Sequence, residues 1–249
     1  MTVETVVIFF AGMAAGAINS IAGGGTLVSF PALMWVGRDP IVANATNAVA
    51  LWPGSLSAAY GYRRELSTIR RWLLVLIVPS LIGGGLGSWL LLRTPTSTFE
   101  RLVPFLILGA TILLALQEII TRHLPKPSEH TRGHMVGIFV FQLLVATYGG
   151  YFGAGMGILM LAALGLLGLT DLHPMNGLKN ILAVAINGIA AIYFTVANAV
   201  AWGDVLVMMT GSIAGGYVGA RIARRLGRRF VRVAVVVIGL FMTIVLFLE

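Results

Sequence analysis

The sequence predicts an all-α polytopic membrane protein. Of its 249 residues, 58% are hydrophobic and 10% are charged, with a mean hydropathy of +0.93, whereas soluble globular chains carry about 25% charged residues. The alternating polar and apolar pattern of barrel strands is absent. Runs that approach the roughly 20 apolar residues needed to cross a bilayer lie at 41–61, 72–92, 102–121, 175–198, 203–220 and 230–248. We therefore expect about six full spanning helices.

Two other apolar stretches are interrupted by glycines. Residues 22–26 read AGGGT, and residues 152–156 read FGAGM. A helix can break at membrane depth only where the unwound backbone is buried in protein or lines a cavity, and paired breaks at corresponding positions point to the substrate site of a transporter. We expect each break to form a re-entrant or discontinuous helical hairpin.

The two breaks belong to an internal duplication. Corresponding residues recur at an offset of 130 to 133 positions, and these pairs are Gly23 and Gly153, Asn47 and Asn180, Ser80 and Ser212. A shared order of glycine break, asparagine-bearing helix and small-residue helix favours two repeats. We expect a first repeat at 1–121, a basic linker at 122–134 and a second repeat at 135–249.

The charges of the loops predict an inverted topology. The connections at 62–71, 122–134 and 221–232 hold most of the arginines, so they should be cytoplasmic. The connections at 93–101 and 198–204 carry little positive charge and should lie outside. Equivalent loops of the two repeats thus face opposite sides, and both termini should lie outside. The net charge of +8 is therefore a topology signal and does not indicate a nucleic-acid partner.

The broken helices supply the first candidate substrate-binding residues. The N-terminal end of a helix carries unpaired backbone N–H groups and a partial positive charge, which together bind anions. The candidates are Gly24, Gly25 and Thr26 in the first repeat and Gly153, Gly155 and Met156 in the second. The alternative is that these glycines only allow helices to pack closely.

Polar residues inside the apolar helices are the other candidates. A charge at the bilayer centre costs at least ~2.5 kcal/mol, so Lys179 should be paired or lie in a cavity, where an anionic substrate is a natural partner. The alternative is a lysine near the surface that extends to water or lipid phosphate. Amide and hydroxyl groups could bind substrate oxygens or join helices by hydrogen bonds; these belong to Asn19, Thr46, Asn47 and Asn180.

Other kinds of chemistry are not indicated. The chain has no cysteine, which excludes disulfides and thiolate metal sites. Its histidines lie in predicted loops, and no nucleotide-binding, hydrolase or metal-ligand pattern occurs. We expect neither an enzyme nor a bound cofactor or metal. Glycines spaced along 83–87 and 211–219 are typical of close helix contacts, within the chain or in a homodimer.

Several motifs resemble those of one family. They are residues 17–26, Ala45-Thr46-Asn47, Trp52-Pro53-Gly54, Gly153-Ala154-Gly155, Lys179-Asn180 and Asn187-Gly188. Together they resemble the sulfite exporter TauE/SafE family of membrane permeases, over essentially the whole chain. The resemblance implies transport of small sulfur-containing anions, such as sulfite or organosulfonates, across the bacterial inner membrane. For a transporter with inverted repeats we expect alternating access around a midplane site. An anion channel and a permease for another carboxylate or oxyanion remain alternatives.

Overall fold

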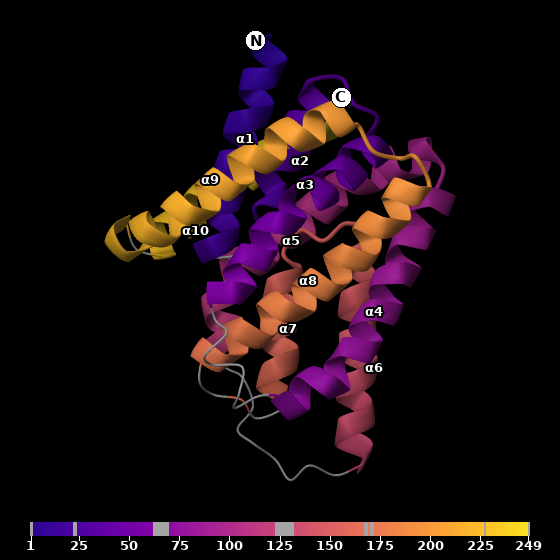
Figure 1. The fold of residues 1–249 in the computed structure, drawn as a ribbon, viewed down its shortest axis with the longest axis vertical. Coiled ribbons are helices and arrows are strands. Elements are labelled where there is room, and N and C mark those ends of the chain that lie inside the picture. The colour runs from indigo at the N-terminus through magenta and orange to yellow at the C-terminus, as the bar shows by residue number, and fades with distance from the viewer. Residues whose placement is uncertain are drawn as a thin grey trace.

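The computed structural model describes residues 2–21, 24–61, 70–122, 132–166, 169, 172–226 and 228–248. Within these residues the chain is helical and has no strand (Figure 1). The helices are α1 (Val3–Ile21), α2 (Thr26–Trp35), α3 (Pro40–Gly61), α4 (Arg70–Arg93), α5 (Thr96–Arg122), α6 (Arg132–Tyr151), α7 (Met156–Leu166), α8 (Leu172–Val196), α9 (Trp202–Leu226) and α10 (Arg228–Leu248). Gly23 and most of the predicted linker lie outside the described residues.

The predicted spans coincide with long helices. They fall on α3, α4, α5, α8, α9 and α10, which are 21 to 27 residues long. Among the described residues, three segments are long and apolar enough to cross a membrane, namely Trp72–Arg93, Thr96–Leu116 and Gly177–Val196. Large apolar side chains such as Leu74 and Phe241 are exposed on these outer helices, as a lipid-facing surface requires. The prediction of an all-helical chain is confirmed within the described residues, and the apolar spans are consistent with a membrane protein.

Each glycine break joins one long helix to one short helix. The long arms α1 and α6 have 19 and 20 residues, and the short arms α2 and α7 have 10 and 11. In the first pair, Arg38 follows α2 and forms an ion pair with Asp204 at the start of α9. Helix α9 runs parallel to α1, because Cβ atoms on Gly211 and Gly215 would overlap the carbonyl oxygens of Phe9 and Met13. Because α2 ends beside the start of α1, this pair is a hairpin.

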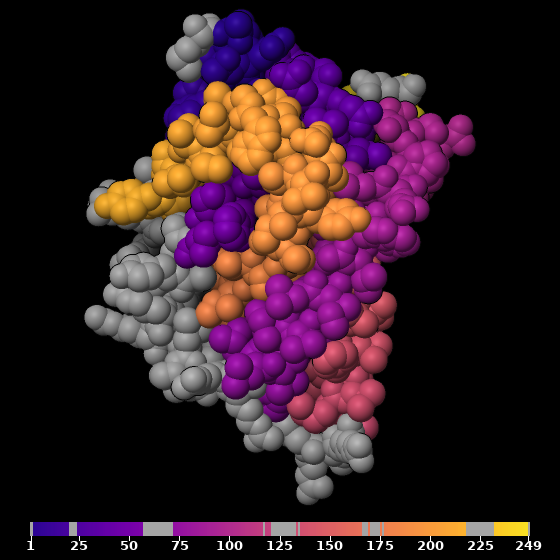
Figure 2. All heavy atoms as spheres, turned by 45° about the vertical axis from the view of Figure 1, so that its right-hand side comes forward, coloured from indigo at the N-terminus to yellow at the C-terminus, as the bar shows by residue number. Residues whose placement is uncertain are grey.

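Glycines bring the long arms into direct contact with helices of the other half of the chain. A Cβ on Gly83 would lie 2.6 Å from the Leu143 carbonyl oxygen of α6, and a Cβ on Gly215 would overlap the Met13 carbonyl oxygen of α1. Figure 2 shows α4 and α6 side by side on the right of the molecule. The expectation that these glycines mark close helix contacts is confirmed within the chain. The glycine faces from which we expect a homodimer are therefore used inside one protomer.

We expect Gly87→Ala to destabilise the protein by about 1–3 kcal/mol, because overpacking a tight contact forces the backbone apart. An added Cβ would overlap the Thr147 carbonyl oxygen and lie 2.6 Å from the Tyr151 nitrogen. Gly85→Ala is the matched control on the same helix, since its nearest described atom would be 3.9 Å away, on Ile189. Thermal unfolding in detergent measures both, and equal midpoints for the two variants would contradict the packing.

The central helices cross between the halves in antiparallel pairs. Arg232 at the start of α10 binds Glu118 near the end of α5, and Phe247 near the end of α10 packs on Phe105 near the start of α5. For α3 and α8, the Trp52 indole donates a hydrogen bond to the Val184 carbonyl. These contacts join the two halves, whose buried side chains form two hydrophobic clusters, one around Phe30 and Phe152 and the other around Met156 and Met160.

Candidate functional site

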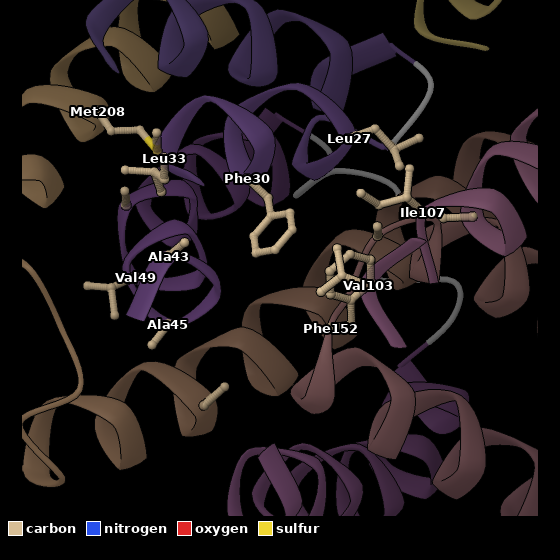
Figure 3. Close-up of a cluster of buried hydrophobic side chains, with 14 of the residues drawn as sticks. Leu27, Phe30, Leu33, Ala43, Ala45, Val49, Val103, Ile107, Phe152 and Met208 are labelled. Carbon is tan, nitrogen blue, oxygen red and sulfur yellow. The ribbon is translucent and has the colours of Figure 1, made fainter. Parts of the chain in front are cut away.

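The two glycine breaks contact adjacent turns of α5. A Cβ on Gly24 would lie 3.6 Å from a Leu114 methyl group, and a Cβ on Gly155 would lie 3.5 Å from Ala110. Residues four apart on a helix are separated by about one turn, or ~5.4 Å. The phenyl rings of Phe30 and Phe152 also meet edge to face, with 5.3 Å between centroids (Figure 3). The breaks thus lie together in one buried region.

Both breaks depend on backbone conformations that favour glycine. The φ angle is +110° at Gly24, +78° at Gly153 and +73° at Gly155. Residues with a side chain rarely adopt these φ values without strain. The glycine patterns found in the sequence therefore set the shape of the chain at each break, whatever else they do.

The first break is closed by its own chain. The Asn19 carbonyl oxygen Oδ1 accepts hydrogen bonds from the backbone N–H groups of Gly24 and Gly25, at 3.2 and 2.8 Å. A side-chain oxygen in this role satisfies the free donors at a helix start. Two of the N–H groups that the sequence suggests for substrate binding are thus paired within the protein.

The other polar candidates of the first half also have protein partners. The Ser29 hydroxyl donates to Asn47 Oδ1, and Asn47 Nδ2 donates to Thr26 Oγ1 at 3.3 Å. Thr46 Oγ1 accepts the backbone N–H of Ala201 at 3.0 Å. For Asn47 and Thr46, these contacts agree with the alternative that polar side chains join the helices.

Several carbonyl groups at the second break accept hydrogen bonds. Asn44 Nδ2 donates to the Tyr151 carbonyl at 2.8 Å, and the Tyr148 hydroxyl donates to the Ala154 carbonyl at 2.6 Å. The backbone N–H of Met156 bonds to the Gly153 carbonyl. Within the described part of the chain, no acceptor is paired with the backbone N–H of Ala154 or Gly155. The second break therefore differs from the first, where Asn19 takes the N–H groups.

Lys179 lies against the helix that follows the second break. Its residue is only 9% exposed. A Cβ on Gly157, the second residue of α7, would lie 3.3 Å from Lys179 Cδ and 3.9 Å from Nζ. The ammonium group thus lies beside a helix N-terminus, which is itself partly positive.

Asn180 differs from its counterpart in the first half. Its side chain is half-buried, and no hydrogen bond joins it to another of the described residues. The offset of 130 residues places Met156 and Leu159 where the first half has Thr26 and Ser29. Met156 and Leu159 have no hydroxyl group, so neither can bind the Asn180 amide as Thr26 and Ser29 bind Asn47. The Asn180 amide is therefore available to a substrate.

One contact at the site is not evident from the sequence. Tyr148 lies on α6 and bonds to the break six residues further on. In the sequence, Tyr148 is marked only as an aromatic residue about one turn before a glycine break. That signal does not separate a site residue from ordinary packing, and Tyr148 indeed packs against both hydrophobic clusters.

Comparison with known proteins places the chain in a family. A model described as sulfite exporter TauE/SafE matches residues 8–246. The chain belongs to the sulfite exporter TauE/SafE family. The resemblance seen in the sequence motifs is thereby confirmed, and the protein is a membrane transporter by family.

Curated relatives of this TauE/SafE protein cover nearly its full length. It is 31% identical to a "probable membrane transporter protein" of Haemophilus influenzae, over 95% of this chain and 92% of the relative. It is 28% identical to the "probable membrane transporter protein YfcA" of Escherichia coli K12, over 95% and 87%. A Sinorhizobium "probable membrane transporter protein ORF9" is 29% identical over 95% and 90%. No solved structure matches the chain significantly.

Proposed function

We propose that the protein is a secondary transporter of small sulfur-containing anions such as sulfite or organosulfonates. The observation that carries this proposal is the position of Lys179, buried against Gly157 at the start of α7. A lysine ammonium and a helix N-terminus together form a binding site for an oxyanion. The sulfur chemistry is suggested by the family to which the chain belongs, the sulfite exporter TauE/SafE family.

In this proposal the substrate lies at the second break. Gly153, Gly155 and Met156 form the backbone wall, while Lys179 and Asn180 provide side-chain donors. Gly24, Gly25 and Thr26, together with Asn19, Thr46 and Asn47, support the opposite wall. We assign the substrate to the second break because the donors at the first break are already bonded to protein acceptors.

We further propose that the halves form inverted repeats in the bacterial inner membrane, with basic loops in the cytoplasm. The antiparallel packing of α5 on α10 supports this topology, since these helices occupy equivalent places in the two halves. The packing of α1 on α9 likewise has its counterpart in that of α6 on α4. Alternating access would then arise from rocking of one half against the other.

Two ion pairs join the halves at opposite ends and are the contacts that such rocking would break. Arg38 Nε lies 2.5 Å from Asp204 Oδ2, and Arg232 Nη2 lies 2.7 Å from Glu118 Oε2. The hydrogen bond to Asp204 and its charge raise the pKa of Arg38, so the guanidinium stays charged. From the loop charges, the Arg38 pair lies at the outer end.

Breaking either pair is expected to expose the site to one side only. A cysteine in place of Asn180 is a single reporter, because the chain has no cysteine. We expect Arg38→Gln to increase severalfold the labelling of this cysteine by an impermeant thiol reagent added outside. Glu118→Gln should increase its labelling by the same reagent added on the cytoplasmic side. Arg93→Gln is the control, since Arg93 lies over Trp89 of its own helix. Equal labelling from both sides in every variant would contradict the proposal that each ion pair closes the site to one side.

Ligand-dependent thermal stability tests the substrate class. The purified protein is heated with sulfite, sulfate, an organosulfonate, a carboxylate or phosphate. A ligand that binds only the folded state adds about 2.7 kcal/mol at 100 times its Kd. We expect sulfite or the sulfonate to give the largest shift. If carboxylates stabilise more strongly than any sulfur anion, the substrate class is wrong.

A further inference from the structure

The two breaks differ in how their backbone N–H groups are paired. At the first, Asn19 presents an acceptor and takes the N–H groups of Gly24 and Gly25. At the second, Gly149 occupies the position that corresponds to Asn19 at an offset of 130. Glycine has no side-chain acceptor, so it cannot close the second break in the same way.

At the second break, two side chains donate to backbone carbonyl groups. The Tyr148 hydroxyl donates to the Ala154 carbonyl at 2.6 Å, and Asn44 Nδ2 donates to the Tyr151 carbonyl at 2.8 Å. Gly153 and Gly155 accept from the backbone N–H groups of Met156 and Ile158. Carbonyl oxygens carry partial negative charge, so each of these bonds reduces the repulsion between a carbonyl group and an anion.

We infer that Tyr148 is a positioning residue that sets the anion selectivity of the second break by occupying the Ala154 carbonyl. This inference rests on the proposed function, because it concerns the same site. Tyr148 does not itself bind substrate. Its hydroxyl donates to the Ala154 carbonyl, which adjoins the N–H groups of Ala154 and Gly155 along the chain, and this hydrogen bond weakens the negative field of that carbonyl. The wall then presents donors to the substrate, and a cation finds few ligands.

The burial of Tyr148 is consistent with this role. Its ring is partly buried and packs against both hydrophobic clusters, one of which contains Phe30 and Phe152 and the other Met156 and Met160. Packing on both sides fixes the ring, so the hydroxyl is directed at one acceptor. Asn44, from the first half of the chain, holds the neighbouring Tyr151 carbonyl and so ties this arrangement to α3.

Tyr148→Phe tests the inference, because it removes the hydroxyl and keeps the ring. In proteoliposomes we expect the KM for sulfite to rise about tenfold while the maximal rate changes less than twofold. The freed carbonyl repels a dianion more than a monoanion. The KM for sulfite at alkaline pH should therefore rise severalfold more than the KM for methanesulfonate. A purely structural defect would weaken both anions alike.

Thr147→Val is the matched control, since the Thr147 hydroxyl also donates to a carbonyl of α6, that of Leu143, but not at the break. We expect its KM values to equal those of the wild type. Unchanged KM values in Tyr148→Phe, or equal losses for both anions, would overturn the inference and leave the proposed function standing. If the wild-type protein transports neither anion, both the inference and the proposed function fail.

Discussion

Lys179→Met is expected to weaken binding of the transported anion about 100-fold, or ~2.8 kcal/mol. A charge-assisted hydrogen bond contributes roughly 1.5–3 kcal/mol, and the buried ammonium of Lys179 lies beside Gly157, at the start of α7. Methionine keeps an unbranched side chain of similar length, so the packing over Gly157 should survive. Titration calorimetry with sulfite measures the affinity.

Two further variants show whether that result reflects the loss of the charge. Lys179→Ala should lose binding to the same extent, with an unchanged elution profile showing that it folds. Lys179→Arg keeps the positive charge and should retain part of the affinity. If Lys179→Met and Lys179→Ala bind sulfite as tightly as the wild type, Lys179 is a structural residue and the assignment of the site is wrong.

The second large effect is expected for Gly157→Leu, which should reduce transport at least about 100-fold. A Cβ at this position already lies 3.3 Å from the Lys179 stem and 3.9 Å from its nitrogen. A leucine side chain would displace the ammonium and fill the space beside the helix start. Gly155 is a less specific position for this test, because its φ of +73° makes any side chain strained and the fold itself could fail.

Gly137→Leu on α6 is the control for Gly157→Leu. No described atom lies within 4 Å of a Cβ at Gly137, and this part of the helix is exposed. Its transport rate should equal that of the wild type. Radiolabelled sulfite uptake into proteoliposomes measures both variants. Normal uptake by Gly157→Leu would show that the start of α7 does not line the substrate path.

The fold was predictable to a large extent because its signals are local. Runs of about 20 apolar residues marked the long helices, and glycines at 24, 153 and 155 marked the two breaks, where the backbone takes positive φ. Small residues at 83, 87 and 215 marked the tight helix contacts. Each of these features depends on a short stretch of sequence and on the known thickness of a bilayer.

The hydrogen bonds of the site were not predictable in this way. The glycine patterns alone give equal weight to both breaks, and they do not show that Asn19 folds back onto Gly24 and Gly25. Nor does the sequence show that Arg38 meets Asp204, 166 residues further on. Such contacts depend on how distant segments pack, so a chain pattern alone could not assign donors and acceptors to the two breaks.

The most direct test of the central claim is counterflow of radiolabelled sulfite in proteoliposomes. Vesicles that contain the wild-type protein are preloaded with unlabelled sulfite and diluted into a trace of labelled sulfite. A transporter that alternates around one anion site should show saturable uptake and a transient accumulation of label, and both should be lost in Lys179→Met. Linear, non-saturating flux without accumulation would indicate a channel and contradict the account, and so would unchanged counterflow in the variant.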